Sequence, residues 1–337
     1  MSTDQNKQPD AKLMISGVVY KKTIGNYTVR AGKQSFSCTL SPRIRKQFCG
    51  FVRDPSDSGR KISRFKTNDD TDPVAIGDVV QFIQASQSTG LIVEVLPRRN
   101  QLARRTAVPM PSARPFEQVI VANVDRVIPV FSAANPAPRW NLLDRYLVSA
   151  ESASLPAFIC ITKMDLADAG DELWDAIEEY REIGYPVCLT SAVTGEGLDE
   201  IKESLQGRIS VFLGKSGVGK SSLLNALDPG LNLRVNEVNR KSGKGVHTTT
   251  NPEMLPLIFG GAVVDTPGVR EFGLWDANPE ELELHFPEMR RFLGRCRFGL
   301  DCRHNEEPGC AIRQAVTAGR ISPRRYQNYL RLRAECQ

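Results

Sequence analysis

A glycine-rich segment that ends in a lysine and a serine is the first candidate for chemistry in this chain. Four residues separate Gly214 from Gly219-Lys220-Ser221, which is the spacing of a Walker A phosphate loop. Glycines let backbone N–H groups close around phosphates, and a helix starting near Lys220 directs its positive end at the same charge. Lys220 is expected to reach the β- and γ-phosphates, and the Ser221 hydroxyl to ligate Mg²⁺. The expected nucleotide contacts in this loop are Gly214, Lys215, Ser216, Gly217, Val218, Gly219, Lys220, Ser221 and Ser222.

A second segment predicts which base the nucleotide carries. In Thr162-Lys163-Met164-Asp165, the Asp165 carboxylate can accept from the N1 and N2 hydrogens of guanine, a donor pair that adenine lacks. Lys163 is expected to lay its aliphatic stem against the base while its charged head stays in water. Ser191-Ala192 would complete the pocket with a backbone N–H to the guanine O6. The first residue of this motif is usually Asn, and Thr162 departs from that pattern.

A third segment, Asp265-Thr266-Pro267-Gly268, follows an apolar run. A carboxylate at the end of a strand suits the Walker B role of holding Mg²⁺ through water, and Gly268 lets the backbone approach the γ-phosphate. On its own this tetrapeptide would indicate only a turn. Downstream of a phosphate loop, it indicates a γ-phosphate-sensing segment.

The group that orients the attacking water is not at its usual place. Many GTPases carry a Gln just after the glycine of the third segment, and here that position holds Val269, which cannot hydrogen-bond. We expect the Thr249 hydroxyl to close on Mg²⁺ and the γ-phosphate, and His247 to position the water, because imidazole can do so near neutral pH. The expected catalytic set is therefore His247, Thr249 and Lys220. The alternative is that His247 only packs in its loop or contacts a partner.

Three cysteines and a histidine predict a metal site near the end of the chain. They fall within fifteen residues, and the chain holds only three histidines. Four such ligands match a closed, tetrahedral Cys₃His zinc site, which is structural rather than catalytic. The alternative is a set of scattered free thiols. The expected ligands are Cys296, Cys302, His304 and Cys310.

The elements that must position these groups stand in an unusual order. Apolar runs that predict buried strands precede each motif, at residues 157–161, 187–189, 209–213 and 262–264. The base-reading motif comes before the phosphate loop, whereas an ordinary GTPase begins with the phosphate loop. We therefore predict a doubly wound α/β domain of the P-loop GTPase type whose chain order is circularly permuted, a rearrangement that a sheet tolerates when its old termini lie close together.

The segments on either side of this domain predict two further modules. Five short β-like runs, which alternate with turns, fit a small OB-fold β-barrel that binds RNA. A polar stretch at residues 53–73 is expected to be a long loop that either contacts RNA or is a plain mobile insertion. The expected boundaries are a disordered tail at 1–12, the OB-fold at 13–97, a linker at 98–115, the GTPase domain at 116–285 and a mainly helical zinc-binding domain at 286–337.

Charge divides along the same boundaries. Residues 1–97 carry 14 basic and 9 acidic residues, residues 98–285 carry 19 and 25, and residues 286–337 carry 11 and 5. Basic modules flanking an acidic enzyme favour a nucleic-acid ligand, although solvated lysines and arginines produce the same asymmetry. No signal peptide or membrane-length apolar run is present, and the remaining five cysteines are dispersed, so we expect a cytoplasmic chain without disulfides.

The combined pattern resembles the RsgA (YjeQ) family of GTPases that depend on the small ribosomal subunit. The motifs TKMD, SA, GKSGVGKS, HTTT and DTPG occur in that family's order, between a barrel-like start and a Cys/His end. The resemblance covers nearly the whole chain. It implies a slow GTPase that the small (30S) subunit stimulates, that contacts 16S rRNA, acts late in subunit maturation and dissociates after hydrolysis.

The resemblance also implies roles for individual residues. The family's Mg²⁺, phosphate and guanine contacts fall on Ser221, Lys220, Asp265, Thr249, Asp165 and Lys163, and its zinc ligands fall on the four residues named above. Five residues separate Cys296 from Cys302, where many relatives have four, so a small loop adjustment is expected.

Two other functions fit parts of the sequence. The first is an RNA-binding switch or chaperone whose GTP hydrolysis serves only recycling. The second is a zinc-stabilised translation or signalling GTPase with a protein target. We expect a monomer, since no sequence feature indicates self-association.

Overall fold

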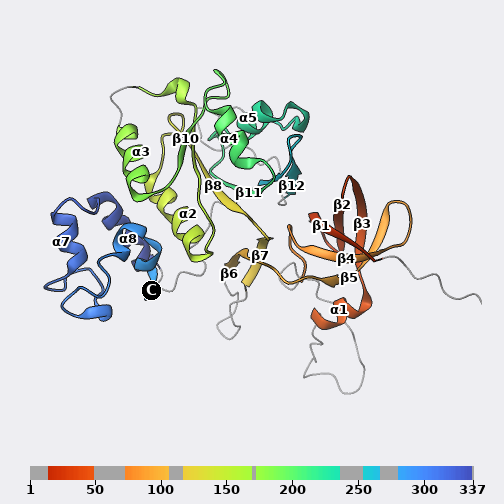
Figure 1. The fold of residues 1–337 in the computed structure, drawn as a ribbon, viewed down its shortest axis with the longest axis horizontal. Coiled ribbons are helices and arrows are strands. Elements are labelled where there is room, and N and C mark those ends of the chain that lie inside the picture. Colours follow the sequence, from red (N-terminus) through yellow and green to blue (C-terminus); the bar gives the residue numbers. More distant parts are fainter. Residues whose placement is uncertain are drawn as a thin grey trace, which may run out of the picture. The chain divides into compact units, whose positions relative to one another are not determined.

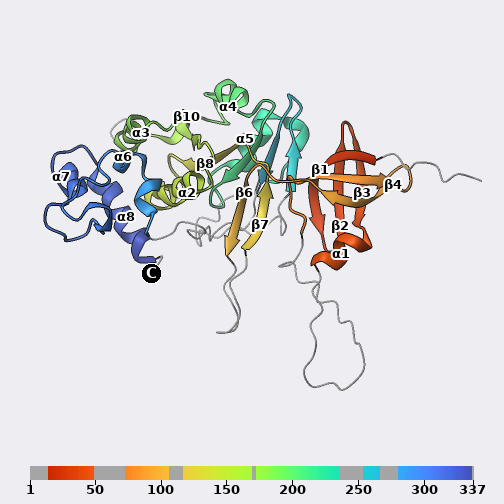
Figure 2. The same ribbon diagram turned by 60° about the horizontal axis from the view of Figure 1, so that its bottom comes forward.

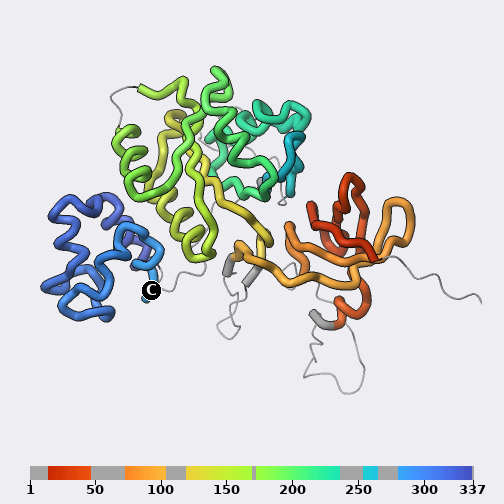
Figure 3. Tube along the Cα trace, in the orientation of Figure 1, coloured from red at the N-terminus to blue at the C-terminus, as the bar shows by residue number. Residues whose placement is uncertain are grey.

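The computed structural model describes residues 14–48, 73–105, 117–168, 172–235, 253–265 and 280–335. The chain forms two compact units, one of residues 1–99 and 120–123 and the other of 100–119 and 124–337. Figures 1 and 3 trace the chain through both of them. Within the described part, no helix is long and apolar enough to cross a membrane.

The first unit is a five-stranded barrel. Its strands pair in the closed order β1-β2-β3-β5-β4-β1, with β3 and β5 parallel and the other pairs antiparallel. This is the strand order of the predicted OB-fold, which is confirmed. Alternate residues of each strand point inward because side chains alternate across a strand, and Val29, Phe36 and Phe82 form part of the buried core. The strands are β1 (Met14–Thr23), β2 (Asn26–Ala31), β3 (Gln34–Leu40), β4 (Val79–Gln84) and β5 (Thr89–Val95).

A short helix that the sequence reading did not predict, α1 (Pro42–Phe48), follows the third strand. Its Ile44 is buried in the barrel core, so its formation depends on tertiary packing as much as on local preference. Beyond the barrel, β6 (Gln101–Arg105) and β7 (Glu117–Ala122) form a separate two-stranded sheet.

The second unit is built on a sheet with the order β10-β9-β8-β11-β13-β12. All of its strands run parallel except β12, which is antiparallel to β13. The parallel strands are buried almost throughout, as expected where helices cover both faces of a sheet. The strands are β8 (Arg126–Ser132), β9 (Ile159–Thr162), β10 (Val187–Leu189), β11 (Ile209–Leu213), β12 (Glu253–Pro256) and β13 (Ala262–Asp265).

Helices cover this sheet in two layers (Figure 2). The helices α4 (Leu198–Leu205) and α5 (Lys220–Leu227) contribute leucines to one core cluster together with strand residues such as Ile128 and Val263. The helices α2 (Trp140–Ser152) and α3 (Glu172–Ile183) contact each other through Trp140 and Tyr180.

The C-terminal module consists of short helices around its own buried cluster. Val148, on α2 of the sheet domain, belongs to this cluster, so the module and the sheet domain share a core. Its elements are η5 (Leu282–His285), α6 (Pro287–Arg290), η6 (Gly299–Asp301), α7 (Ala311–Thr317) and α8 (Pro323–Glu335).

Candidate nucleotide and metal sites

The glycine-rich loop lies between β11 and α5, and α5 begins at Lys220. Gly217 and Gly219 have φ values of 86° and 92°, which L side chains rarely adopt. A Cβ atom on Gly214 would lie 2.5 Å from the Val130 carbonyl oxygen, so only glycine fits there. The loop therefore requires glycine at these positions, as the predicted phosphate loop does.

The Lys220 ammonium lies over the loop that it follows. Its Nζ donates to the carbonyl oxygens of Gly214, at 2.7 Å, and Lys215, at 3.1 Å. These carbonyls hold the charge at the mouth of the loop, where a phosphate would compete for the same donor.

The base-reading segment lies at the same edge of the sheet as the phosphate loop. It follows β9, which pairs with β8 on one side, while β11 pairs with β8 on the other. Since these strands are parallel, their carboxyl ends meet at one edge, where the direction of winding reverses. The permuted sequence therefore brings the two motifs together although 48 residues separate Asp165 from Gly214.

Thr162 connects the two motifs directly. Its hydroxyl is buried, donates to the Val218 carbonyl of the phosphate loop and lies 3.2 Å from the Phe131 carbonyl on β8. The threonine that stands in place of the usual Asn thus donates a hydrogen bond to the phosphate loop.

Lys163 has a left-handed backbone with φ of 59°. Its Nζ donates to the carbonyl of Gly217, at 2.7 Å, and to that of Asn135 in the loop after β8. Burial lowers the pKa of Lys163, and the nearby Asp165 charge opposes that shift. The ammonium is therefore held by backbone oxygens, which leaves its aliphatic stem available to a planar base.

The Asp165 carboxylate is oriented by Ser191. The Ser191 hydroxyl donates to Asp165 Oδ1 at 2.5 Å and accepts from the backbone N–H groups of Val193 and Thr194, both at 3.2 Å. Sequence reasoning assigned only a backbone role to Ser191-Ala192, and it missed this side-chain bond. The position of a serine just after a predicted strand could have indicated this bond. The bond from Lys163 to Asn135 could not be predicted from residue types, because its acceptor is a backbone carbonyl.

Four expected residues of this site lie wholly or partly outside the described part of the chain. His247, Thr249 and Gly268 fall in the segments that the structure does not describe, and Asp265 is described only as the last backbone position of β13. Their roles stay predictions.

The three cysteines and the histidine of the C-terminal module converge. Cys296, Cys302, His304 and Cys310 are all buried, and their candidate ligand atoms all lie within 4.8 Å of one another. His304 Nδ1 lies 3.5 Å from the Cys296 sulfur and 3.4 Å from the Cys310 sulfur, which are 3.9 Å apart. Tetrahedral thiolate ligands around zinc stand about 3.8 Å apart, given Zn–S bonds of about 2.3 Å.

Hydrogen bonds from the surroundings reach two of the sulfurs and the backbone of His304. Backbone N–H groups of Ala311 and Arg313 donate to the sulfurs of Cys296 and Cys310, at 3.3 and 3.5 Å. The Tyr326 hydroxyl donates to the His304 carbonyl at 2.6 Å. The donor set, its spacing and its surroundings are thus compatible with a zinc site.

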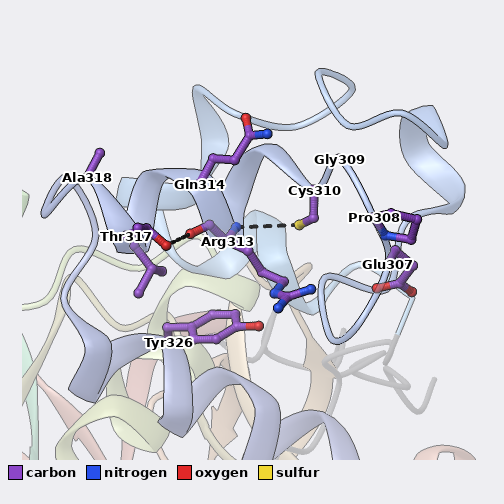
Figure 4. A pocket seen from close by; sticks show the side chains of 10 residues that line it. Glu307, Pro308, Gly309, Cys310, Arg313, Gln314, Thr317, Ala318 and Tyr326 are labelled. Carbon is purple, nitrogen blue, oxygen red and sulfur yellow. Dashed lines mark hydrogen bonds between the residues drawn. The ribbon is translucent and has the colours of Figure 1, made fainter.

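A pocket of about 500 Å³ adjoins the metal-ligand cluster (Figure 4). Cys310, Arg313, Thr317 and Tyr326 are among its lining residues. No residue of the phosphate loop or the base-reading motif lines this pocket, so it is separate from the candidate nucleotide site.

Comparisons with known proteins agree with this arrangement. Residues 95–275 match the sequence model of the RsgA GTPase family. Among proteins named small ribosomal subunit biogenesis GTPase RsgA, that of Gemmatimonas aurantiaca is 46% identical over 95% of this chain and 97% of its own length. The protein of that name from Pseudomonas aeruginosa strain LESB58 is 43% identical over 80% of this chain and 78% of its own.

Solved structures extend the similarity to the fold. YjeQ from Thermotoga maritima is 34% identical and superimposes with a TM-score of 0.72, covering 96% of this chain and 99% of its own. YloQ, described as a circularly permuted GTPase, is 31% identical with a TM-score of 0.66, covering 98% and 97%. The predicted circular permutation is confirmed. The chain belongs to the RsgA family of GTPases.

Proposed function

We propose that this protein hydrolyses GTP to GDP and phosphate in the late maturation of the small ribosomal subunit, and that it dissociates from the subunit after hydrolysis. The observation that carries the nucleotide assignment is the direct bonding of the base-reading segment to the phosphate loop, through Thr162 to Val218 and Lys163 to Gly217. The ribosomal assignment is supported by the names of the relatives, which are GTPases of small-subunit biogenesis.

Each nucleotide contact is assigned to a residue of suitable chemistry. Asp165, held by Ser191, accepts from guanine, while the stem of Lys163 lies on the base. The nucleotide phosphates attract the Lys220 ammonium away from the loop carbonyls, because a charged acceptor makes the stronger bond. Ser221, Thr249 and, through water, Asp265 hold Mg²⁺, which neutralises charge on the phosphates when bound.

Hydrolysis is assigned to the segment between the phosphate loop and β13. His247 positions the attacking water, and Thr249 and Lys220 complete the catalytic set. The backbone of Gly268 approaches the γ-phosphate and reports its presence.

The Cys₃His cluster binds one structural Zn²⁺ in this proposal. Four protein ligands fill a tetrahedral shell, which leaves no position for substrate and makes the site structural. The mutual distances of 3.4 to 3.9 Å among three of the ligand atoms support this assignment.

The partner is the small ribosomal subunit and its 16S rRNA, bound by a cytoplasmic monomer. The stretch 286–337 carries exposed arginines, among them Arg291, Arg295 and Arg297, and planar guanidinium groups match phosphate oxygens two at a time. The barrel supplies the second RNA-binding surface, in keeping with a fold that often binds oligonucleotides.

Sedimentation with purified ribosomal subunits tests this proposal. The protein should pellet with small subunits in a non-hydrolysable GTP analogue and remain in the supernatant with GDP. Equal pelleting in both nucleotides, or pelleting with large subunits alone, would contradict the proposal.

A further inference from the structure

A buried cluster of charged side chains joins the C-terminal module to α2 of the sheet domain. Arg325 of α8 has a fully buried side chain. Within its own module it forms a paired bond with Glu288, Nε to Oε1 at 2.8 Å and a terminal nitrogen to Oε2 at 3.0 Å. Across to α2, it donates to Asp144 Oδ1 at 2.5 Å.

Asp144 is also fully buried, and its carboxylate accepts from two further donors. The amide of Asn328 on α8 donates to one oxygen, and the Tyr180 hydroxyl on α3 donates to the other at 2.6 Å. A buried carboxylate is tolerated only when such bonds replace its lost hydration, so each donor must keep its geometry. The cluster therefore fixes α8 relative to α2 and α3.

Other contacts surround this cluster on the same boundary. Arg324 pairs with Glu179 of α3 and lies over the rings of Trp140 and Tyr180. Val148 of α2 is packed in the core of the C-terminal module. The position of α2 is thus determined by the C-terminal module as well as by its own sheet.

The N-terminal end of α2, about one turn before Asp144, leads to the candidate nucleotide site. The loop between β8 and α2 contains Asn135, whose carbonyl accepts from the Lys163 ammonium. The same loop is closed by the Ser132 hydroxyl, which donates to the Pro136 carbonyl at 2.7 Å. A shift of α2 would move this loop and with it the backbone oxygen that holds Lys163.

We propose that Asp144 and Arg325 are positioning residues for guanine-nucleotide binding, acting through α2 and the loop whose Asn135 carbonyl holds Lys163. The inference rests on the proposed nucleotide site. The expected effect of these residues is on binding of the guanine base, which GTP and GDP share, and not on the reacting γ-phosphate. Loosening the cluster should weaken binding of both nucleotides and leave the hydrolytic step unchanged.

The test uses the full-length, zinc-loaded protein and the variant Asp144→Asn, which keeps the side-chain shape and removes the charge. Titration with fluorescent GDP should give a Kd roughly three- to tenfold higher than that of the wild type. The KM for GTP should rise by the same factor, while kcat stays within roughly twofold, as expected for a lost ground-state contact. Global destabilisation alone would not produce this split.

Two further variants sharpen the test. Asp144→Asn combined with Arg325→Met removes both charges of this pair, and it should cost less affinity than the two single changes together, because the double variant loses the Asp144–Arg325 contact only once. Glu335→Gln is the matched control, since it breaks the more exposed pair with Arg145 between the same two helices and should leave the Kd for GDP unchanged.

Wild-type affinity for GDP in a folded Asp144→Asn protein would overturn the inference. If that variant fails to fold, Asn328→Ala, which removes one donor to Asp144, carries the test, and wild-type affinity in it is equally contradictory. A wild-type protein that does not bind GDP at all would instead refute the proposed nucleotide site.

Discussion

At the scale of single residues, the candidate nucleotide site depends on hydroxyl groups that connect separate motifs. Thr162 bonds to the phosphate loop, and Ser191 orients the carboxylate of Asp165. Both side chains are buried, so the Thr162 bond is protected from competing water, whereas the Asp165 carboxylate that Ser191 orients is exposed. The threonine at the usual asparagine position therefore keeps a connection between base recognition and phosphate binding.

This connection predicts the effect of Thr162→Val, which preserves the shape of the side chain and removes its donor. The Val218 carbonyl then loses a hydrogen bond, and the Kd for GDP should rise roughly two- to tenfold, the equivalent of one net hydrogen bond. Thr162→Ser keeps the hydroxyl and should bind GDP nearly as well as the wild type. Equal affinities of the valine and serine variants, measured by calorimetry, would show that the bond has no role in binding.

At the scale of elements, the C-terminal module depends on its metal-ligand cluster and on a few buried helices. Its helices are short, α6 with four residues and α7 with seven, and helices of that length gain their stability from packing rather than from local preference. Cys310 caps α7, because its sulfur accepts from the Arg313 backbone N–H. One candidate metal ligand is thus also the N-cap of a helix in this module.

Removal of zinc should therefore unfold the C-terminal module. Acid release followed by colorimetric detection should give one zinc per chain in the wild type and none in Cys302→Ala. The variant should lose helical circular dichroism, because a small module of this kind draws much of its folding free energy from the metal. A zinc-free wild-type protein with an unchanged unfolding temperature would contradict a structural role.

A buried carboxyl in the same module predicts a pH-dependent change in stability. Burial raises the pKa of Glu283, and Arg333 opposes the shift only partly, from 4.0 Å. A carboxyl with a raised pKa destabilises the folded state once pH exceeds its folded pKa, and it has no such effect below its unfolded value near 4.5. Glu283→Gln should accordingly raise the unfolding temperature at neutral pH, and the gain should vanish in acid. Destabilisation by the substitution at neutral pH would show that the pair with Arg333 dominates.

The strands and motifs of this protein were predictable from sequence because their signals are local. Short β-like runs separated by turns predicted the five barrel strands, and glycine spacing together with an apolar run predicted the strand, loop and helix around Lys220. The helix α1 was missed, since it depends on burying Ile44 in the barrel. Asp144 and Arg325 were missed because, in a sequence, buried ion pairs are indistinguishable from the charged residues of a solvated helix face.

At the scale of the whole molecule, the circular permutation changes which elements adjoin the C-terminal module. The described contacts attach that module to α2 and α3, the helices that follow β8 and β9. The chain enters the module from β13, whose end carries the γ-phosphate-sensing motif in our proposal. The module thus packs on helices next to the base-reading segment, and in sequence it follows the proposed γ-phosphate-sensing segment. Such a placement suits a protein whose affinity for its partner depends on the bound nucleotide.

The most direct test of this account is the steady-state GTPase rate of the purified protein alone, with small ribosomal subunits and with large subunits, repeated with His247→Ala. We predict a large stimulation by small subunits only, and its loss in the variant. Equal rates in all three mixtures would contradict the ribosome-dependent function. Stimulation that persists in the variant would keep that function and remove His247 from the catalytic set.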